Sequence, residues 1–138
     1  MNLFLKAYIL LILIVLNVNA NEWVLVANKN FPIDTIDASD IKRLYLGKIN
    51  QINVYTIDVL NQPLQKSITQ DFIKQTTGMN DKSYLKWWLK QQIIGRGVPP
   101  KIMLSDTDVL ERLKSNELTL GYIAKSKMNK DLKKIIIQ

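Results

Sequence analysis

The chain has 138 residues, a formal net charge of +7 at pH 7, no cysteine and no histidine. Without cysteine there are no disulfides and no thiolate chemistry, and without histidine the usual general base and the commonest metal ligand are missing. The sequence also has no Walker loop and no dinucleotide-binding glycine fingerprint. We therefore expect a non-catalytic protein with no cofactor and no metal site.

The beginning of the chain has the organisation of a secretory signal peptide. Lys6 precedes an apolar run at 7–16, and a small-residue exit of the A-x-A kind ends at Ala20. The run is shorter than the roughly 20 residues that span a bilayer, which favours cleavage after Ala20 over a retained anchor. We expect a signal peptide at 1–20, a periplasmic or secreted location, and one domain at 21–138.

The basic charge indicates which partners to expect. Attraction to small anions or to an anionic envelope surface is physically reasonable, and a solvated basic surface without a partner is the alternative. Nucleic acid is not expected, because the chain lacks an aromatic-plus-basic recognition motif and is predicted to be exported.

Strands and helices are predicted to alternate along the domain. The continuous apolar run at 23–27 predicts a strand buried on both faces, as in a parallel sheet. The β-branched and aromatic run at 52–59 predicts a second strand, and 118–124 and 134–137 predict two more. This alternation is typical of an α/β fold with a largely parallel sheet.

Four helices are predicted between and after the strands. The residues expected at their starts are Asp37, Pro63, Asn80 and Ser105, and Gly47 and Gly78 are expected to end the first two. The predicted buried sides are Ile41, Leu44 and Tyr45; Leu64, Ile68 and Phe72; Tyr84, Leu85, Trp88 and Leu89; and Val109, Leu110 and Leu113. We expect one of Trp87 and Trp88 in the core, and the other either at the core edge or on a stacking or docking surface.

The most distinctive segment is the loop at 95–101, with the sequence Gly-Arg-Gly-Val-Pro-Pro-Lys. Its glycines permit positive φ, so that backbone N–H groups can turn toward one point and favour an anion. Lys101 adds a cation, and the helix that begins at Ser105 offers its first N–H groups. We expect Arg96, Gly97, Lys101 and Ser105 to bind a small anion such as phosphate, with Ser67 and Thr69 as further candidates. The alternative is a turn whose arginine caps carbonyls or pairs with an acidic side chain.

Four motifs in series resemble the phosphate-type periplasmic substrate-binding proteins of ABC transporters. Residues 44–49 resemble the IFLGK helix end of that family, and residues 93–101 resemble the F-x-G-x-G-x-P-P-K loop of its short exported members. Residues 105–109 match the serine-acidic helix start, and 120–123 match the GAIGY strand. The order and spacing of these motifs agree along nearly all of the predicted domain.

This resemblance implies one α/β lobe of a class II periplasmic binding protein, with a mostly parallel central sheet and about four helices. It implies a substrate-binding component that binds a small anion such as phosphate and works with an ABC permease. Full-length relatives have two lobes and an R-S-x-G-S-G-T phosphate loop, whose counterpart at 56–63 has no arginine, serine or glycine here. The alternative is an envelope interaction module without a ligand, which pairs with itself or with an envelope protein.

Overall fold

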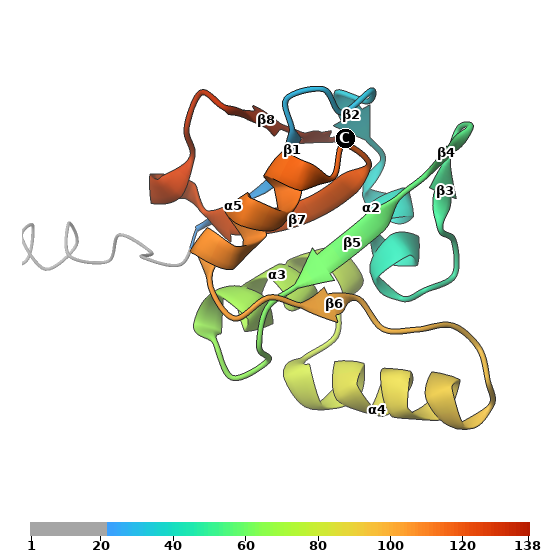
Figure 1. The fold of residues 1–138 in the computed structure, drawn as a ribbon. Helices are drawn as coiled ribbons and strands as arrows, with labels where there is room; N and C mark the ends of the chain where they lie inside the picture. Colours follow the sequence, from blue (N-terminus) through green and yellow to red (C-terminus); the bar gives the residue numbers. More distant parts are fainter. Residues whose placement is uncertain (1–21) are drawn as a thin grey trace, which may run out of the picture.

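A five-stranded sheet in the order β6-β5-β7-β1-β8 organises residues 22–138, the part of the chain that the computed structural model describes (Figure 1). Its strands are β1 (Trp23–Asn28), β5 (Asp58–Asn61), β6 (Lys101–Ile102), β7 (Thr119–Ala124) and β8 (Leu132–Lys134). β5 pairs in parallel with β6 and β7, whereas β1 is antiparallel to β7 and β8. All strands of this sheet except β1 therefore run in one direction, and the expected α/β fold with a mostly parallel sheet is confirmed. The predicted signal peptide lies outside the described residues.

Three strand predictions need correction. The run at 52–59 is not one strand, because β3 (Gln51–Ile52) and β4 (Tyr55–Thr56) form a hairpin before β5 begins. The turn of this hairpin contains Asn53 at φ 54°, a left-handed conformation that asparagine tolerates. β1 is buried as expected but antiparallel, since an apolar run indicates burial on both faces and not direction. The run at 134–137 is not one strand either, because β8 ends at Lys134 and β9 (Ile136–Ile137) pairs in parallel with β2 (Thr35–Ile36) in a separate sheet.

The described residues contain the four predicted helices. They are α2 (Ala38–Tyr45), α3 (Ser67–Thr77), α4 (Asp81–Ile93) and α5 (Asp106–Ser115), followed by a short 3-10 turn, η1 (Lys125–Lys127). Asn80 Oδ1 and Ser105 Oγ accept hydrogen bonds from the amides of Ser83 and Asp108 at 2.8 and 3.1 Å, which confirms both predicted caps. None of the described helices is long and apolar enough to cross a membrane.

The other two helix starts differ from the prediction. Asp37 occupies the N-cap position of α2, but its carboxylate accepts a hydrogen bond from Gln138 Nε2 at 3.0 Å instead of capping the helix. Pro63 opens a turn, closed by the Lys66 amide donating to the Pro63 carbonyl at 3.0 Å, and not a helix. α3 therefore begins only at Ser67, with Lys66 at its N-cap position.

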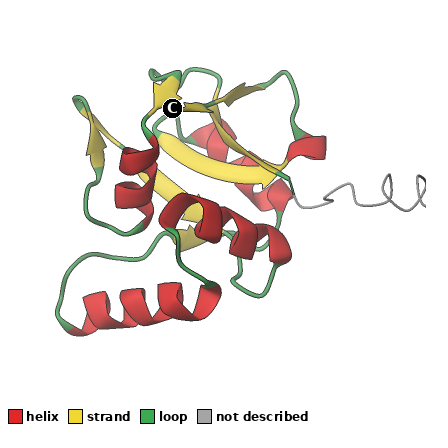
Figure 2. Cartoon of the chain, turned by 180° about the vertical axis from the view of Figure 1, so that it is seen from behind, coloured by secondary structure: helices red, strands yellow, loops and turns green. Residues whose placement is uncertain are grey.

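Helices cover both faces of the sheet (Figures 1 and 2). On one face, side chains of β1 and β7 such as Leu25 and Tyr122 pack with α2, α3 and α4; on the other, Val26 and Ile123 pack with Val109 of α5. α5 packs so close to the sheet that a Cβ at Gly121 would lie only 2.8 Å from Val109 Cγ1. Alternate residues of one strand thus pack into two different cores, one on each face of the sheet. This explains why the strands appear in the sequence as unbroken apolar runs.

α4 is buried on a narrower side than predicted. Tyr84 and Trp88 are buried, but Leu85 and Leu89 are each 50% exposed. Trp88 Nε1 donates to the Tyr45 carbonyl at 3.3 Å, and the half-buried Trp87 donates to the Leu46 carbonyl at 3.0 Å. Both indoles therefore hold α4 against the end of α2, as core and core-edge side chains.

Candidate functional site

The predicted site residues lie on opposite edges of the sheet. Lys101 begins β6, where it pairs with Leu60 of β5, and together with Gly97 it lines a hollow at the edge that we call the amino edge. Ser67 and Thr69 follow the end of β5, and Ser105 follows the end of β6, at the carboxyl edge. The residues expected from the sequence to form a single anion site therefore lie at two separate edges of the sheet.

The amino edge has a hollow of about 530 Å³ beside the loop at 97–101. Lys48, Lys101 and Arg112 bring positive charge to its lining, and Asp58 brings negative charge. Gly97 has φ 81°, as the left-handed turn prediction requires. The Arg96 side chain is exposed, is not among the residues lining the hollow, and forms no ion pair with the described residues.

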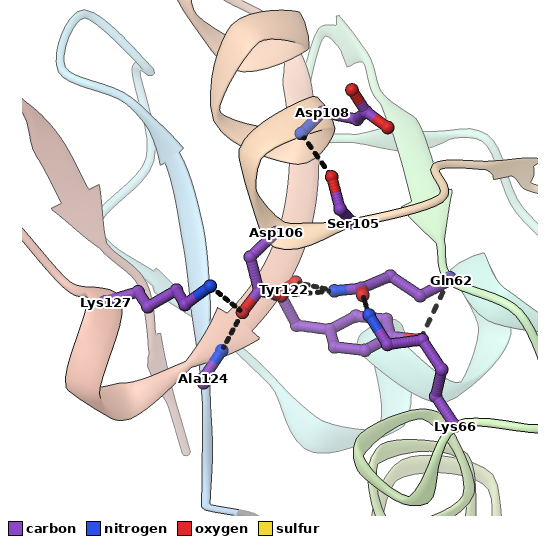
Figure 3. Close-up of polar contacts among 8 residues, drawn as sticks. All are labelled: Gln62, Lys66, Ser105, Asp106, Asp108, Tyr122, Ala124 and Lys127. Atoms are coloured by element: carbon purple, nitrogen blue, oxygen red, sulfur yellow. Dashed lines mark hydrogen bonds and ion pairs between the residues drawn. The ribbon is translucent and has the colours of Figure 1, made fainter.

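The carboxyl edge holds a connected polar cluster centred on the fully buried Gln62 (Figure 3). Gln62 Nε2 donates to Asp106 Oδ1 and to the Tyr122 carbonyl, both at 2.9 Å. Lys66 Nζ donates to Gln62 Oε1. Gln62 therefore links the start of α3 to β7 and to the start of α5.

Asp106 is the acidic member of this cluster and is only 8% exposed. Its Oδ2 accepts a hydrogen bond from the Ala124 amide at 3.4 Å and lies 3.8 Å from Lys127 Nζ (Figure 3). It also lies in the first turn of α5, where the helix dipole favours negative charge. The carboxylate is therefore compensated from three directions: by Gln62, by Lys127 and by the helix.

Three buried tyrosines lie beneath the cluster and act as neutral hydrogen-bonding groups. Tyr122 donates to Asn61 Oδ1, Tyr84 to the Tyr45 carbonyl at 2.9 Å, and Tyr45 to the Leu60 carbonyl at 2.7 Å. Burial raises the pKa of Tyr122 to about 12. Burial, reinforced by neighbouring tyrosines, also raises the pKa of Tyr45 well above its usual value and is the main reason that the pKa of Tyr84 is raised. At neutral pH these hydroxyls supply hydrogen bonds and no base.

The first turn of α3 is the part of the carboxyl edge that suits an anion. Lys66 at the N-cap position makes no side-chain cap, and the first turn has no acidic residue. Thr69 is fully buried beside the Tyr122 hydroxyl, and its own hydroxyl has no well-formed hydrogen bond with the described residues. Because the first amides of a helix have no partner within the helix, this start combines N–H donors with one cation.

Sequence reasoning missed the central members of this cluster, Gln62, Lys66 and Asp106. The sequence did contain a signal for them, because polar residues that directly follow parallel strands gather at the carboxyl edge of the sheet. The incorrect helix start at Pro63 hid it, because it placed Lys66 inside a helix. Residues 22–138 contain no group of acidic side chains arranged to hold a metal ion.

The sequence matches no protein-family model and no curated protein. The fold, in contrast, matches a part of several solved substrate-binding proteins. It superposes on a protein described as a phosphate ABC transporter substrate-binding protein, with bound phosphate, from Clostridium perfringens, with a TM-score of 0.64, 21% identity, and coverage of 83% of this chain and 44% of that chain. An ABC-type phosphate transport receptor from Vibrio cholerae matches with a TM-score of 0.65 and 15% identity over 83% of this chain and 45% of that one. PstS from Borrelia burgdorferi matches with a TM-score of 0.60 and 13% identity over 84% and 47%.

These matches confirm the predicted likeness to phosphate ABC transporter substrate-binding proteins at the level of the fold. The chain spans less than half the length of each of these structures. Their similarity therefore assigns a single-lobe architecture to the described residues, and the activity of the whole neighbouring proteins enters only as a proposal.

Proposed function

We propose that the protein is an exported, non-catalytic substrate-binding lobe that binds a small oxyanion such as phosphate at the start of α3. The observation that carries the proposal is the first turn of this helix, which begins at the carboxyl end of β5 without a side-chain cap, without an acidic residue, and with Lys66 beside it. Ligands of open α/β sheets bind at this edge, and helix N-termini bind anions there.

In this site, the Thr69 amide and the Lys66 ammonium group are the proposed ligands. Ser67 already makes a contact within the protein, so we rank it below Thr69 as a ligand candidate. The Thr69 hydroxyl is buried in the same turn without a well-formed hydrogen bond. The structural neighbour from Clostridium perfringens was determined with bound phosphate, which favours phosphate as the first ligand to test.

The amino-edge hollow is a second candidate position for the anion. It is favoured by the three cations Lys48, Lys101 and Arg112, and by the positive φ of Gly97. Asp58 and the greater exposure of this hollow argue against it, because exposed cations are screened by solvent and salt. Ser105 is a weaker ligand candidate, since its Oγ already accepts the Asp108 amide.

Isothermal titration with phosphate, sulfate and chloride at constant ionic strength tests the proposal. Lys66→Gln is expected to weaken phosphate binding by about tenfold or more, because a hydrogen bond to a charged group contributes about 1.5–3 kcal/mol. Lys101→Gln, which removes the same charge at the amino edge, is expected to leave binding unchanged. The reverse order of effects would move the site to the hollow. Absence of heat and of any thermal stabilisation with all three anions would remove the binding proposal.

Export and partnership with an ABC permease complete the proposal. Protein recovered from the envelope is expected to begin at Asn21, and intact Met1 in cytosolic material would contradict export. Chemical cross-linking in cells is expected to join the lobe to a permease subunit. The interaction module without a ligand is not favoured, because the similar solved structures are substrate-binding proteins.

A further inference from the structure

One side of α4 is exposed although it is apolar. The helix forms one end of the molecule in both views, with the sheet on one side of it only (Figures 1 and 2). Leu85 and Leu89 are each 50% exposed and Ile93 is 84% exposed. These side chains are spaced by four residues, so they form one line along the outer surface.

The loop after α4 extends this apolar line. Ile94 is 49% exposed and Val98 is 85% exposed. Large aliphatic side chains are rarely gathered on one exposed element unless that element contacts something. We refer to Leu85, Leu89, Ile93, Ile94 and Val98 as the α4 face.

Positive charge surrounds the α4 face. Lys82, Lys86 and Lys90 are exposed and follow one another at one-turn intervals along the helix, and Arg96 and Lys101 lie exposed in and after the loop. Residues 82–104 contain no acidic residue, although the whole chain has 12. The surface is therefore both apolar and strongly cationic.

A second copy of the chain does not suit this surface. A symmetric dimer would place the α4 face against itself and bring two sets of cations together, which is unfavourable. A flat surface of opposite charge suits it better, because the helix projects from one end of the molecule and no other element of residues 22–138 blocks it (Figures 1 and 2). Anionic lipid headgroups offer that charge, and the hydrocarbon below them accepts aliphatic side chains.

We propose that the α4 face docks the protein on an anionic lipid bilayer. Leu85, Leu89 and Ile93 enter the boundary between headgroups and acyl chains. The lysines of α4 keep their methylene groups along the apolar surface and their ammonium groups among the lipid phosphates. This docking surface is separate from the proposed oxyanion site on α3, and neither proposal depends on the other.

Single-cysteine probes test the docking geometry, because the chain has no cysteine of its own. Ile93→Cys and Val54→Cys are labelled with a polarity-sensitive fluorophore; both parent residues are 84% exposed, but Val54 lies in the hairpin turn between β3 and β4. Vesicles of phosphatidylglycerol and phosphatidylethanolamine in equal amounts are expected to shift the Ile93 probe to shorter wavelength and to leave the Val54 probe unchanged. Phosphatidylcholine vesicles are expected to shift neither.

Charge variants supply the matched control. The variant K82Q/K86Q/K90Q is expected to bind the anionic vesicles about a hundredfold more weakly, since each headgroup-bound lysine contributes roughly a fivefold factor. The variant K29Q/K42Q/K130Q removes the same charge from other exposed positions and is expected to lose less than about tenfold. Circular dichroism confirms that each variant is folded.

Four results would overturn the proposal, and three of them come from the vesicle measurements alone. These three are an unshifted Ile93 probe, equal shifts at Ile93 and Val54, and equal losses of affinity in the two triple-lysine variants. A shift of the Ile93 probe that needs an added acidic protein and does not occur with vesicles alone would also overturn it, in favour of a protein partner.

Discussion

The polar side chains at the two edges of the sheet have opposite environments, exposed at one edge and buried at the other. At the amino edge, Lys101 and its neighbours line an open hollow. At the carboxyl edge, Gln62, Asp106 and Tyr122 are buried and joined by hydrogen bonds. A motif that is distinctive in the sequence thus forms an exposed loop, whereas residues that look ordinary in the sequence form the organised cluster.

This difference matters because burial sets the free energy of a lost hydrogen bond. A buried polar group without its partner loses about 1–3 kcal/mol, whereas an exposed group regains its hydrogen bonds from water. We therefore expect the carboxyl edge to determine stability and the amino edge to tolerate substitution.

The largest effect is expected from Gln62→Met. The apolar side chain leaves the Asp106 carboxylate, the Tyr122 carbonyl and the Lys66 ammonium group without the partner that Gln62 supplies. The free energy of unfolding, measured with urea, is expected to fall by about 3 kcal/mol. The matched variant Lys101→Met at the amino edge is expected to change it by less than about 0.5 kcal/mol. Equal losses in the two variants would remove the distinction between the edges.

Alkaline pH is expected to act on the carboxyl edge next. Tyr122 has its pKa raised to about 12, above the value of about 10 for an unfolded tyrosine. The folded state therefore favours the protonated form. This stabilisation is complete below about pH 10 and is lost as pH rises toward about 12, and it amounts to at most roughly 3 kcal/mol for this group. Urea unfolding at about pH 9 and about pH 11 measures the loss. Tyr122→Phe is expected to reduce the difference in the free energy of unfolding between the two pH values. An unchanged difference would mean that other groups cause the pH dependence.

Helix caps are expected to have intermediate effects. Ser105→Ala removes the cap of α5 at the carboxyl edge, and Asn80→Ala removes the cap of α4. Each is expected to lower the free energy of unfolding by about 1 kcal/mol, measured as a shift in melting temperature. Asp37→Ala is expected to have less effect, because the Asp37 carboxylate does not cap α2. A loss for Asp37→Ala as large as the other two would contradict this reading of the N-cap geometry.

The smallest effect is expected from Thr69→Val. The shapes of the two side chains are nearly the same, and the Thr69 hydroxyl is buried without a well-formed hydrogen bond. Replacing it is expected to leave the free energy of unfolding within about 0.5 kcal/mol of the parent, or to raise it. A loss above about 1 kcal/mol would show that the hydroxyl has a partner in solution, and phosphate titration of the same variant shows whether that partner is the anion.

Local signals in the sequence predicted much of the fold. The caps at Asn80 and Ser105 and the glycines that end α2 and α3 were correct, because each depends on residues within one turn of the chain. The errors arose where distant contacts decide. Leu85 and Leu89 match a buried helical stripe, but within residues 22–138 they stay half-exposed. The run at 52–59 contains a turn that its β-branched residues conceal.

The sequence by itself determined the α/β class, the positions of four helices, and the exclusion of cysteine and histidine chemistry, since these follow from composition and short-range periodicity. The tertiary structure decided which side chains meet. Strand order brings Gln62, Asp106 and Tyr122 together over separations of 44 and 60 residues, and the same order sends Lys101 to the opposite edge from Ser67. Such pairings are set by the packing of whole elements against two cores, and no local pattern records them.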